Sequence, residues 1–437
     1  MGDQWAKGRR RLDPGALRLP DGMQFDCHHS GRCCEDFWEI PIDRDSLETI
    51  RSLPLSSISP KFLDPEHYTE PRLGRPGELA LGRIERRCVF LTSGRRCVIH
   101  QNFGHAAKPQ ACRDFPFRYI ETPGGVFVGL SMACPSVRAN EGRPIEEHRQ
   151  ELAANYATSL SVRPVTDPIE LAPKVPVDFD TYERIESCLN DILRFETTAL
   201  DDRLIGGFVF LQLLERAVTE LEEPAGNAAA TIRQLLELFR QSQYQRVRRI
   251  ALKARGSRGL HRALLGLLVT YRSAFDQRRR GRLGQTAFLL WQYFRHMGGF
   301  GQLSMPPISR RVSKSRMRGA RVDWDDPYFV HRIERFVRHS VFRKDLIVAT
   351  PVIKGYGFLL LFVALIRWYT LAFAAARGEE RVARLDLDEA IGVVEKYYCF
   401  HSDFMRLFDW FPLLSGTLDR LLAKPAFAPS AVRPKGP

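Results

Sequence analysis

Apolar residues recur at every third or fourth position along most of the second half of the chain. Six stretches share this spacing: 180–196, 206–223, 229–242, 286–297, 357–376 and 385–411. Such a period places the apolar side chains on one face of a helix. The pattern predicts a helical domain over residues 181–422, followed by a disordered tail at 423–437 that is rich in Pro and Ala.

The first third of the chain has a different pattern. Residues 23–160 contain short apolar runs, such as 88–91 and 124–134, separated by turn signals, which predicts a few short strands and loops. One helix is expected near residues 41–53, with Asp43 as its N-cap. The prediction is an α+β protein in which a small cysteine-rich, metal-binding domain precedes a larger, mostly α-helical domain.

Two segments are expected to lack regular structure. Residues 1–22 are basic and broken by Pro14, Gly15 and Pro20, so we expect a flexible N-terminal arm. Residues 161–180 contain four prolines and predict a linker between the two domains. No apolar run of signal-peptide length follows the first basic residues, so we expect no export and a cytoplasmic location.

The apolar stretch 357–376 is long enough to cross a bilayer. Arg367 lies near its centre, where a lone charge is costly in lipid. We therefore expect a buried helix in which Arg367 is paired or reaches an edge, and no membrane span.

Seven of the nine cysteines fall within 108 residues. At this chain length no disulfide staple is needed for stability, and thiols stay reduced in the cytosol. Thiolates converging on one point repel each other unless a cation lies between them, so the density favours a metal centre. The spacing matches neither the paired hooks of a zinc ribbon nor a ferredoxin run, and it leaves one site or two open. The expected ligands are Cys27, Cys33, Cys34, Cys88, Cys97, Cys112 and Cys134, whereas Cys188 and Cys399 lie on apolar helix faces and are expected in the core.

The cysteine-bearing blocks resemble a known family. "FDCHHSGRCCEDFWEIPID", "CVFLTSGRRCVIH", "KPQACRDFPF" and "LSMACPS" are similar to successive blocks of the YkgJ-type cysteine-cluster family of zinc- or iron-chelating proteins. The block order and the helical second half resemble its flagellin lysine-N-methylase branch. This resemblance implies an iron–sulfur cluster, 4Fe–4S above all, or zinc. For the methylase branch it also implies transfer of a methyl group from S-adenosylmethionine to lysine. The family has a further cysteine where this chain has His28, His29 and Ser30.

Histidines next to the cysteines are candidate ligands. Neutral imidazole binds zinc and iron, and the candidates are His28, His29, His100 and His105. Two adjacent histidines cannot easily face one ion, so at most one of the first pair is expected to bind. Simple surface histidines are the preferred interpretation for each. Arg113, beside Cys112, is as plausible a neighbour of a thiolate cluster as an ordinary turn residue.

The net charge of +14 is concentrated in two segments. Residues 246–282 hold twelve Lys or Arg against one Asp, and residues 310–321 hold six against none. Phosphate contacts are conceivable, but no array of aromatic residues accompanies the charge, so nucleic acid is an unlikely ligand. We expect the first segment to form solvated helix faces, and 310–321 to form a disordered basic loop that touches an acidic partner.

Three functions remain open from the sequence. The first is a cysteine-cluster protein that binds iron–sulfur or zinc and uses its helical domain to recognise a protein substrate or partner. The second is an S-adenosylmethionine-dependent protein lysine N-methyltransferase, as the resemblance implies. The third is a non-catalytic interaction module with a structural zinc. No Gly-rich loop between a strand and a helix with an acidic residue beyond it, as in Rossmann-like methyltransferases, is found in the sequence.

Overall fold

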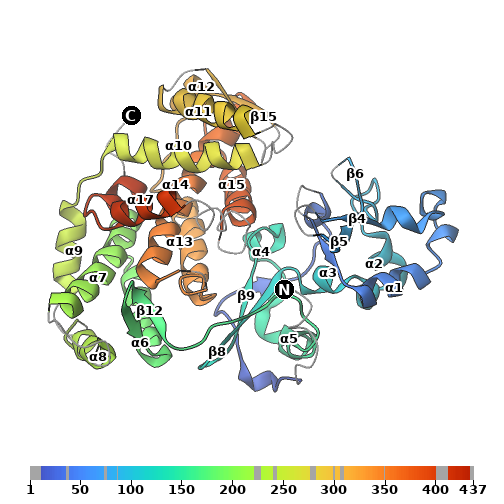
Figure 1. Ribbon diagram of the computed structural model, residues 1–437, viewed down its shortest axis with the longest axis horizontal. Coiled ribbons are helices and arrows are strands. Elements are labelled where there is room, and N and C mark those ends of the chain that lie inside the picture. Colours follow the sequence, from blue (N-terminus) through green and yellow to red (C-terminus); the bar gives the residue numbers. More distant parts are fainter. Residues whose placement is uncertain are drawn as a thin grey trace. The chain divides into compact units, whose positions relative to one another are not determined.

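The computed structural model of the protein describes residues 11–35, 39–72, 76–85, 87–220, 228–239, 244–275, 282–298, 301–305, 310–348, 350–399 and 412–433. Helix makes up 58% and strand 14%, which confirms the α+β class. The chain divides into two compact units (Figure 1). Unit 1 comprises residues 1–121 and 125–164, and unit 2 comprises residues 122–124 and 165–437.

Unit 1 is built on small sheets. The largest has four strands in the order β1 (Leu17–Arg18), β9 (Gly125–Leu130), β8 (Phe117–Thr122) and β11 (Val162–Pro164). A three-stranded sheet has the order β3 (Pro41–Ile42), β5 (Leu79–Leu81), β4 (Thr69–Pro71). Two further pairs are β10 (Arg143–Pro144) with β2 (Gln24–Phe25), and β6 (Arg83–Ile84) with β7 (Arg87–Cys88). These strands are short because turn residues interrupt each apolar run.

The helices of unit 1 are short as well. They are α1 (Arg44–Ser52), α2 (Val98–Phe103), α3 (Gln110–Asp114), α4 (Pro135–Ala139) and α5 (Arg149–Tyr156). The 3₁₀ helices are η1 (Pro14–Ala16), η2 (Arg32–Cys34), η3 (Leu55–Ser57), η4 (Pro60–Phe62), η5 (Pro65–Tyr68), η6 (His105–Ala107) and η7 (Ile145–His148). The predicted cap of α1 is confirmed: the Asp43 carboxylate accepts from the Ser46 backbone N–H at 2.8 Å.

Two segments expected to lack structure are ordered. Residues 11–22 contain η1 and β1, and β1 pairs in parallel with β9 while Leu17 and Leu19 are buried. Residues 1–10 of the predicted arm lie outside the described residues. In the predicted linker, β11 pairs with β8, and β12 (Ile169–Ala172) forms a hairpin with β13 (Val175–Val177). The expectation was wrong because pairing with other strands satisfies the backbone hydrogen-bonding groups of these segments, and the prolines interrupt that pairing at single positions only.

Unit 2 is mostly helical, as predicted. Its helices are α6 (Phe179–Leu193), α7 (Leu200–Glu220), α8 (Ala228–Leu238), α9 (Tyr244–Lys253), α10 (Arg258–Phe275), α11 (Arg282–Gly298), α12 (Lys314–Gly319), α13 (Pro327–Phe342), α14 (Val352–Arg377), α15 (Arg384–Tyr397), α17 (Pro412–Leu422) and α18 (Phe427–Val432). A second hairpin joins β14 (Gln302–Met305) to β15 (Arg310–Ser313). Within the stretch 385–411 expected to be helical, residues 400–411 lie outside the described part.

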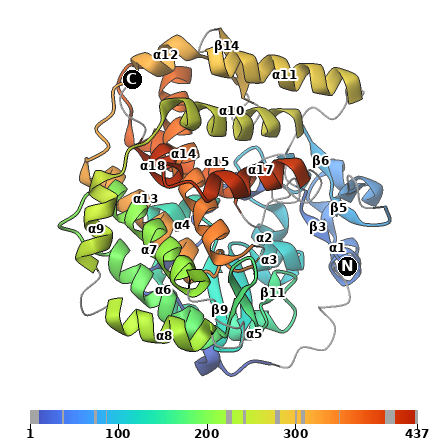
Figure 2. The same cartoon turned by 60° about the vertical axis from the view of Figure 1, so that its left-hand side comes forward.

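The apolar helix α14 is the core of unit 2. It is the one described helix long and apolar enough to cross a membrane, but 83% of its most apolar 18-residue window is buried within the protein. Helices α7, α10, α15 and α18 pack against it (Figure 2). Arg367 is paired as expected: its guanidinium donates to Asp201 at 2.5 Å and to the Val432 carbonyl at 2.6 Å. The helix is therefore arranged as the core of a folded unit.

Two other expectations for unit 2 were wrong. The tail at 423–437 was expected to be disordered, yet Phe427–Val432 form α18 with all six residues buried, whereas residues 434–437 lie outside the described part. The basic segment 310–321 forms β15 and α12 instead of a disordered loop. In both cases a few apolar residues, such as Phe427, Val312 and Met317, are buried and outweigh the polar or proline-rich composition around them.

His296 on α11 gives unit 2 a sensitivity to acid. Its ring is 2% exposed and packs on α10, where a Cβ at Gly266 would lie 2.7 Å from it. Burial, followed by the charges of Lys314, His261 and Arg262, lowers the pKa of His296 to about 3.

We expect this histidine to destabilise the fold as the pH falls. Because its folded pKa lies below the unfolded value, its contribution is present above roughly pH 6.5 and is lost toward pH 3. Between pH 7 and pH 5 the loss amounts to about 2 kcal/mol. Urea unfolding of the wild type and of His296→Gln at both pH values measures it, with the exposed His331→Gln as the control. An equal pH effect in the wild type and in His296→Gln would contradict the assignment.

Candidate metal centre

The seven clustered cysteines all lie in unit 1, and all nine cysteines of the chain are free thiols. Six of the seven lie at or close to the end of a short element, and the seventh, Cys112, lies within a short helix. Cys27 follows β2, Cys33 and Cys34 end η2, Cys88 ends β7, Cys97 precedes α2, Cys112 lies in α3 and Cys134 precedes α4. Cys188 and Cys399, expected in the core, are each 1% exposed in unit 2.

Four of these thiols share one apolar core. Cys88 is part of a buried cluster that includes Phe62, Phe90 and Ile99. Cys34, Cys97 and Cys112 pack against the same cluster from three other segments. The fold therefore brings cysteines that are up to 78 residues apart in sequence to one side of a single core.

Cys33 influences the ionisation of four other cysteines of this group. Its sulfur is 3.7 Å from that of Cys34. Cys33 also acts on Cys88, Cys112 and Cys134, in each case opposing their ionisation. The hydrogen bond to Cys33, together with burial, raises the pKa of Cys34, and burial raises the pKa of Cys88 to about 12. Burial and the neighbouring thiols therefore oppose the ionisation of Cys34, Cys88, Cys112 and Cys134.

Lys108 is a cation of this region that sequence reasoning missed. Burial opposes its charge, but Cys112, Cys33, Cys97 and Cys27 together raise the pKa of Lys108. The ammonium group therefore lies within the electrostatic range of thiols from four segments. A lysine at this place can offset the negative charge of a thiolate cluster.

Three of the candidate histidines lie in a row near Lys108, with one ring pair tilted and the other edge to face. The ring centroids of His29 and His100 are 5.0 Å apart, and those of His100 and His105 are 5.7 Å apart. Burial and then Lys108 lower the pKa of His105 to about 4, although part of the residue remains exposed. A neutral imidazole is the form that can bind a metal. His28 points elsewhere and lies 3.6 Å from Glu141.

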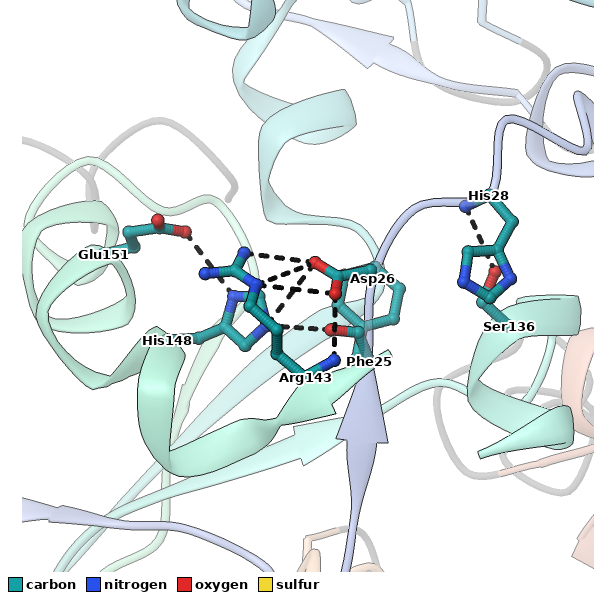
Figure 3. A network of polar contacts seen from close by, with 7 residues as sticks. All are labelled: Phe25, Asp26, His28, Ser136, Arg143, His148 and Glu151. Atoms are coloured by element: carbon teal, nitrogen blue, oxygen red, sulfur yellow. Dashed lines mark hydrogen bonds and ion pairs between the residues drawn. The ribbon is translucent and has the colours of Figure 1, made fainter. Parts of the chain in front are cut away.

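The segment that carries Cys27 is held by a polar network (Figure 3). The Asp26 carboxylate accepts from the Arg143 backbone N–H at 2.9 Å and from its guanidinium at 3.1 Å. These contacts lower the pKa of Asp26. His148 donates through Nε2 to the Phe25 carbonyl at 2.8 Å. The backbone N–H of His28 reaches the Ser136 hydroxyl at 3.4 Å, which places the Cys27 segment beside the start of α4 and Cys134.

A second clamp joins three other cysteine segments. The Glu35 carboxylate, next to Cys34, accepts from Arg87 and from Arg95, each at 2.5 Å. Arg87 precedes Cys88, and Arg95 is two residues before Cys97. Burial opposes the charge of Glu35, but the two guanidinium groups lower its pKa overall. Gly31, with φ of 68°, lets the two loops touch, since a Cβ there would lie 2.6 Å from the Arg95 carbonyl oxygen.

We expect Glu35→Gln to loosen this site. The substitution keeps the side chain's shape and removes the charge that holds both arginines. Mutation of a group that orients metal ligands typically lowers metal affinity by about ten- to a hundredfold. We therefore expect Glu35→Gln to lose its metal to a chelator more readily than the wild type, by a factor of about the same size. Glu48→Gln is the matched control, because its pair with Arg44 at 2.9 Å is fully on the surface. Equal metal retention in the two variants would contradict a positioning role for Glu35.

Among the described residues, the hydrogen bonds of the Arg113 side chain go to nearby residues of its own segment and not to the thiols. Its guanidinium donates to the Ala106 carbonyl at 2.6 Å and to the Gln110 side chain. The buried Asp114 accepts from Gln110, from Asn155 and from the Leu160 backbone N–H. Arg113 and Asp114 therefore shape the turn around Cys112, and the interpretation of Arg113 as an ordinary structural residue is favoured by these contacts.

The types of side chain at this site suit a soft metal ion, but the side chains are too far apart to bind one in this structure. Among the described residues, no three His, Cys, Asp or Glu side chains lie close enough together to hold an ion. The thiols are nevertheless within electrostatic range of each other around one core, with a cation beside them. Thiolate sulfur is the ligand preferred by zinc and by iron–sulfur clusters. The chemistry of the side chains therefore fits such a group, and the thiols would have to come closer together to bind it.

Searches for relatives gave no match. No protein-family model, no curated protein and no solved structure matches this chain.

Proposed function

We propose that unit 1 holds an iron–sulfur cluster or zinc through its thiolates, and that the helical unit 2 recognises a protein partner or substrate. One observation carries this proposal: Cys34, Cys88, Cys97 and Cys112 meet at one apolar core, and the Cys33 sulfur lies 3.7 Å from that of Cys34. Neutral thiols could pack at one core without a metal. The half-buried cation Lys108 beside these thiols is consistent with a negatively charged cluster.

The thiol pKa values make metal binding dependent on pH. A thiol must lose its proton to bind metal, and burial makes that loss unfavourable for Cys88 and Cys112. Metal uptake should therefore release protons and weaken as the pH falls. Lys108 and the clamps at Asp26 and Glu35 would hold the ligand segments in place. Such a reduced-thiol site is in keeping with a cytoplasmic protein.

Anaerobic purification followed by an ultraviolet–visible spectrum and by iron, zinc and sulfide analysis tests the proposal. Iron and sulfide in near-equal amounts, with brown charge-transfer absorption, would support a cluster. Stoichiometric zinc without colour would support a structural zinc site, the basis of the non-catalytic interaction module. Protein that contains no metal, with free thiols, would overturn the proposal.

Methyl transfer to a protein lysine is implied by the resemblance to the methylase branch alone. Binding of S-adenosylmethionine to the metal-loaded protein, measured by calorimetry, separates this enzyme from a binding module. Transfer of labelled methyl groups to a lysine-containing protein would then define the activity. Absence of binding to the loaded protein would leave the metal-centre proposal intact and remove the methylase.

A further inference from the structure

Helix α11 has its apolar side chains on the outside. Among the α11 residues with described side chains, the exposed ones are Gly284, Ala287, Leu290, Trp291, Phe294 and Gly298. Leu290 is 54% exposed, Trp291 52% and Phe294 66%. The polar Gln292 and His296 are buried instead, at 4% and 2%. This is the reverse of the usual pattern for a surface helix, whose polar face meets water.

The elements that contact α11 cover its inner face and leave its outer face exposed. Helix α10 packs against the side that carries His296, and β14 contacts the helix as well. In Figure 2, α11 lies at the edge of unit 2, beyond α10. Among the described residues, the other exposed large apolar side chains are aliphatic, and Trp291 and Phe294 are the exposed large aromatic residues. The two aromatic rings and the leucine lie on consecutive turns and form one apolar surface, and exposed apolar surfaces of this kind mark sites of interaction with an apolar partner.

The part of the sequence that contains α11 is strongly basic. Residues 246–321 contain nineteen Lys or Arg and one acidic residue, and residues 277–321 contain no acidic residue. The Arg295 guanidinium carbon lies 4.3 Å above the Trp291 ring, directly beside the apolar face. Lys314 donates to the His296 carbonyl at the last turn of α11, at 2.5 Å. Burial, followed by the charges of Arg262 and Arg318, lowers the pKa of Lys314 to about 8.

We propose that the outer face of α11 binds the surface of an anionic phospholipid bilayer. Leu290, Trp291 and Phe294 would enter the boundary between headgroups and acyl chains, and the basic residues around α11 would contact the phosphates. Trp and Phe on one face with Arg and Lys nearby are the features of helices that lie in a membrane interface. A second copy of the chain is disfavoured as the occupant, because two such basic regions would repel each other. This inference is independent of the metal centre in unit 1.

Vesicle co-sedimentation of the full-length protein tests the proposal. The vesicles are phosphatidylcholine alone, or equal parts of phosphatidylcholine and phosphatidylserine. We expect binding to the phosphatidylserine vesicles, weakened by added salt, and a loss of about tenfold in binding for the double variant Trp291→Ser, Phe294→Ser. The matched control is Leu63→Ser, Ile84→Ser, which removes two exposed apolar side chains of unit 1 and should bind as the wild type does. Tryptophan emission that shifts to the blue in the wild type but much less in Trp291→Phe would place the ring in the interface.

Three results would overturn the proposal. The wild type could fail to sediment with phosphatidylserine vesicles, or the double variant could sediment as well as the wild type does. Light scattering could instead show a wild-type dimer that becomes a monomer in the double variant, which would make this face an interface between copies. Because all four substituted side chains are exposed, circular dichroism melting should confirm that every variant is folded.

Discussion

Cys33→Ala, Cys34→Ala is expected to lose its metal and to destabilise unit 1. These two thiols are adjacent at the end of η2, and Cys33 is the one that acts on Cys34, Cys88, Cys112 and Cys134. The other five thiols come from separate segments, so removal of the two adjacent thiols that lie among them should prevent four of them from binding one metal centre. Since a bound metal contributes folding free energy directly, loss of the centre should also lower the unfolding temperature of unit 1.

The metal-to-protein ratio after anaerobic purification, together with thermal unfolding, measures the effect. We expect the ratio to fall by about tenfold or more. Cys188→Ala is the matched control, because this thiol is 1% exposed on α6 and belongs to unit 2, whereas the seven clustered cysteines belong to unit 1. It should cost about 1 kcal/mol of stability without changing the metal content. Full metal occupancy in the double variant would show that Cys33 and Cys34 are not ligands.

Single variants rank the thiols further. Cys33→Ala should lose more metal than Cys27→Ala, because Cys27 is the exposed member of the group and acts on fewer of the other thiols. The reverse order would place the centre nearer to β2 and the start of α4. The ranking therefore also tells whether the seven thiols serve one site or two.

Local patterns predicted the helices and the cysteine-rich part of the chain. The three- and four-residue spacing placed α6, α7, α8, α11 and α14, and the Asp43 cap of α1 followed from its position before an apolar run. The central Arg367 indicated a paired charge in a buried helix, and Asp201 is its partner. Each of these features depends on neighbours along the chain, which a sequence displays directly.

Features that depend on distant segments were not predicted. Leu17 in β1 pairs with Val126 in β9, and Val162 in β11 pairs with Tyr119 in β8. Neither pairing joins segments that are neighbours in the sequence. Lys108 and the clamp from Glu35 to Arg87 and Arg95 carry no local signal, because lysines and arginines are abundant in this chain. The exposed apolar face of α11 was missed for a related reason: periodicity identifies a helix and its two faces, but it does not say which face is covered.

Arg343→Met is expected to destabilise unit 2 by about 3–5 kcal/mol. Arg343, just after α13, is 1% exposed, and it donates to Asp345 at 2.9 Å and to Glu395 on α15 at 2.5 Å. Burial opposes its charge, but Asp345 and Glu395 together raise the pKa of Arg343. Next to it, Lys344 donates to Glu186 on α6 at 2.7 Å. The two ion pairs tie the end of α13 to α15 and to α6, and the substitution removes the one with α15.

The pH dependence identifies the cause of the destabilisation. With Met at position 343, two carboxylates remain buried without their cation, and burial raises the pKa of such groups above the unfolded value. The variant then binds protons on folding, so its deficit in the free energy of unfolding should shrink as the pH falls from 8 to 5. Urea unfolding at both pH values measures this, with Arg184→Met as the control, since Arg184 and Asp180 form an exposed pair at 3.0 Å that contributes about 1 kcal/mol or less. A deficit that is small, or that stays constant with pH, would mean that packing rather than the buried charge of Arg343 holds these helices together.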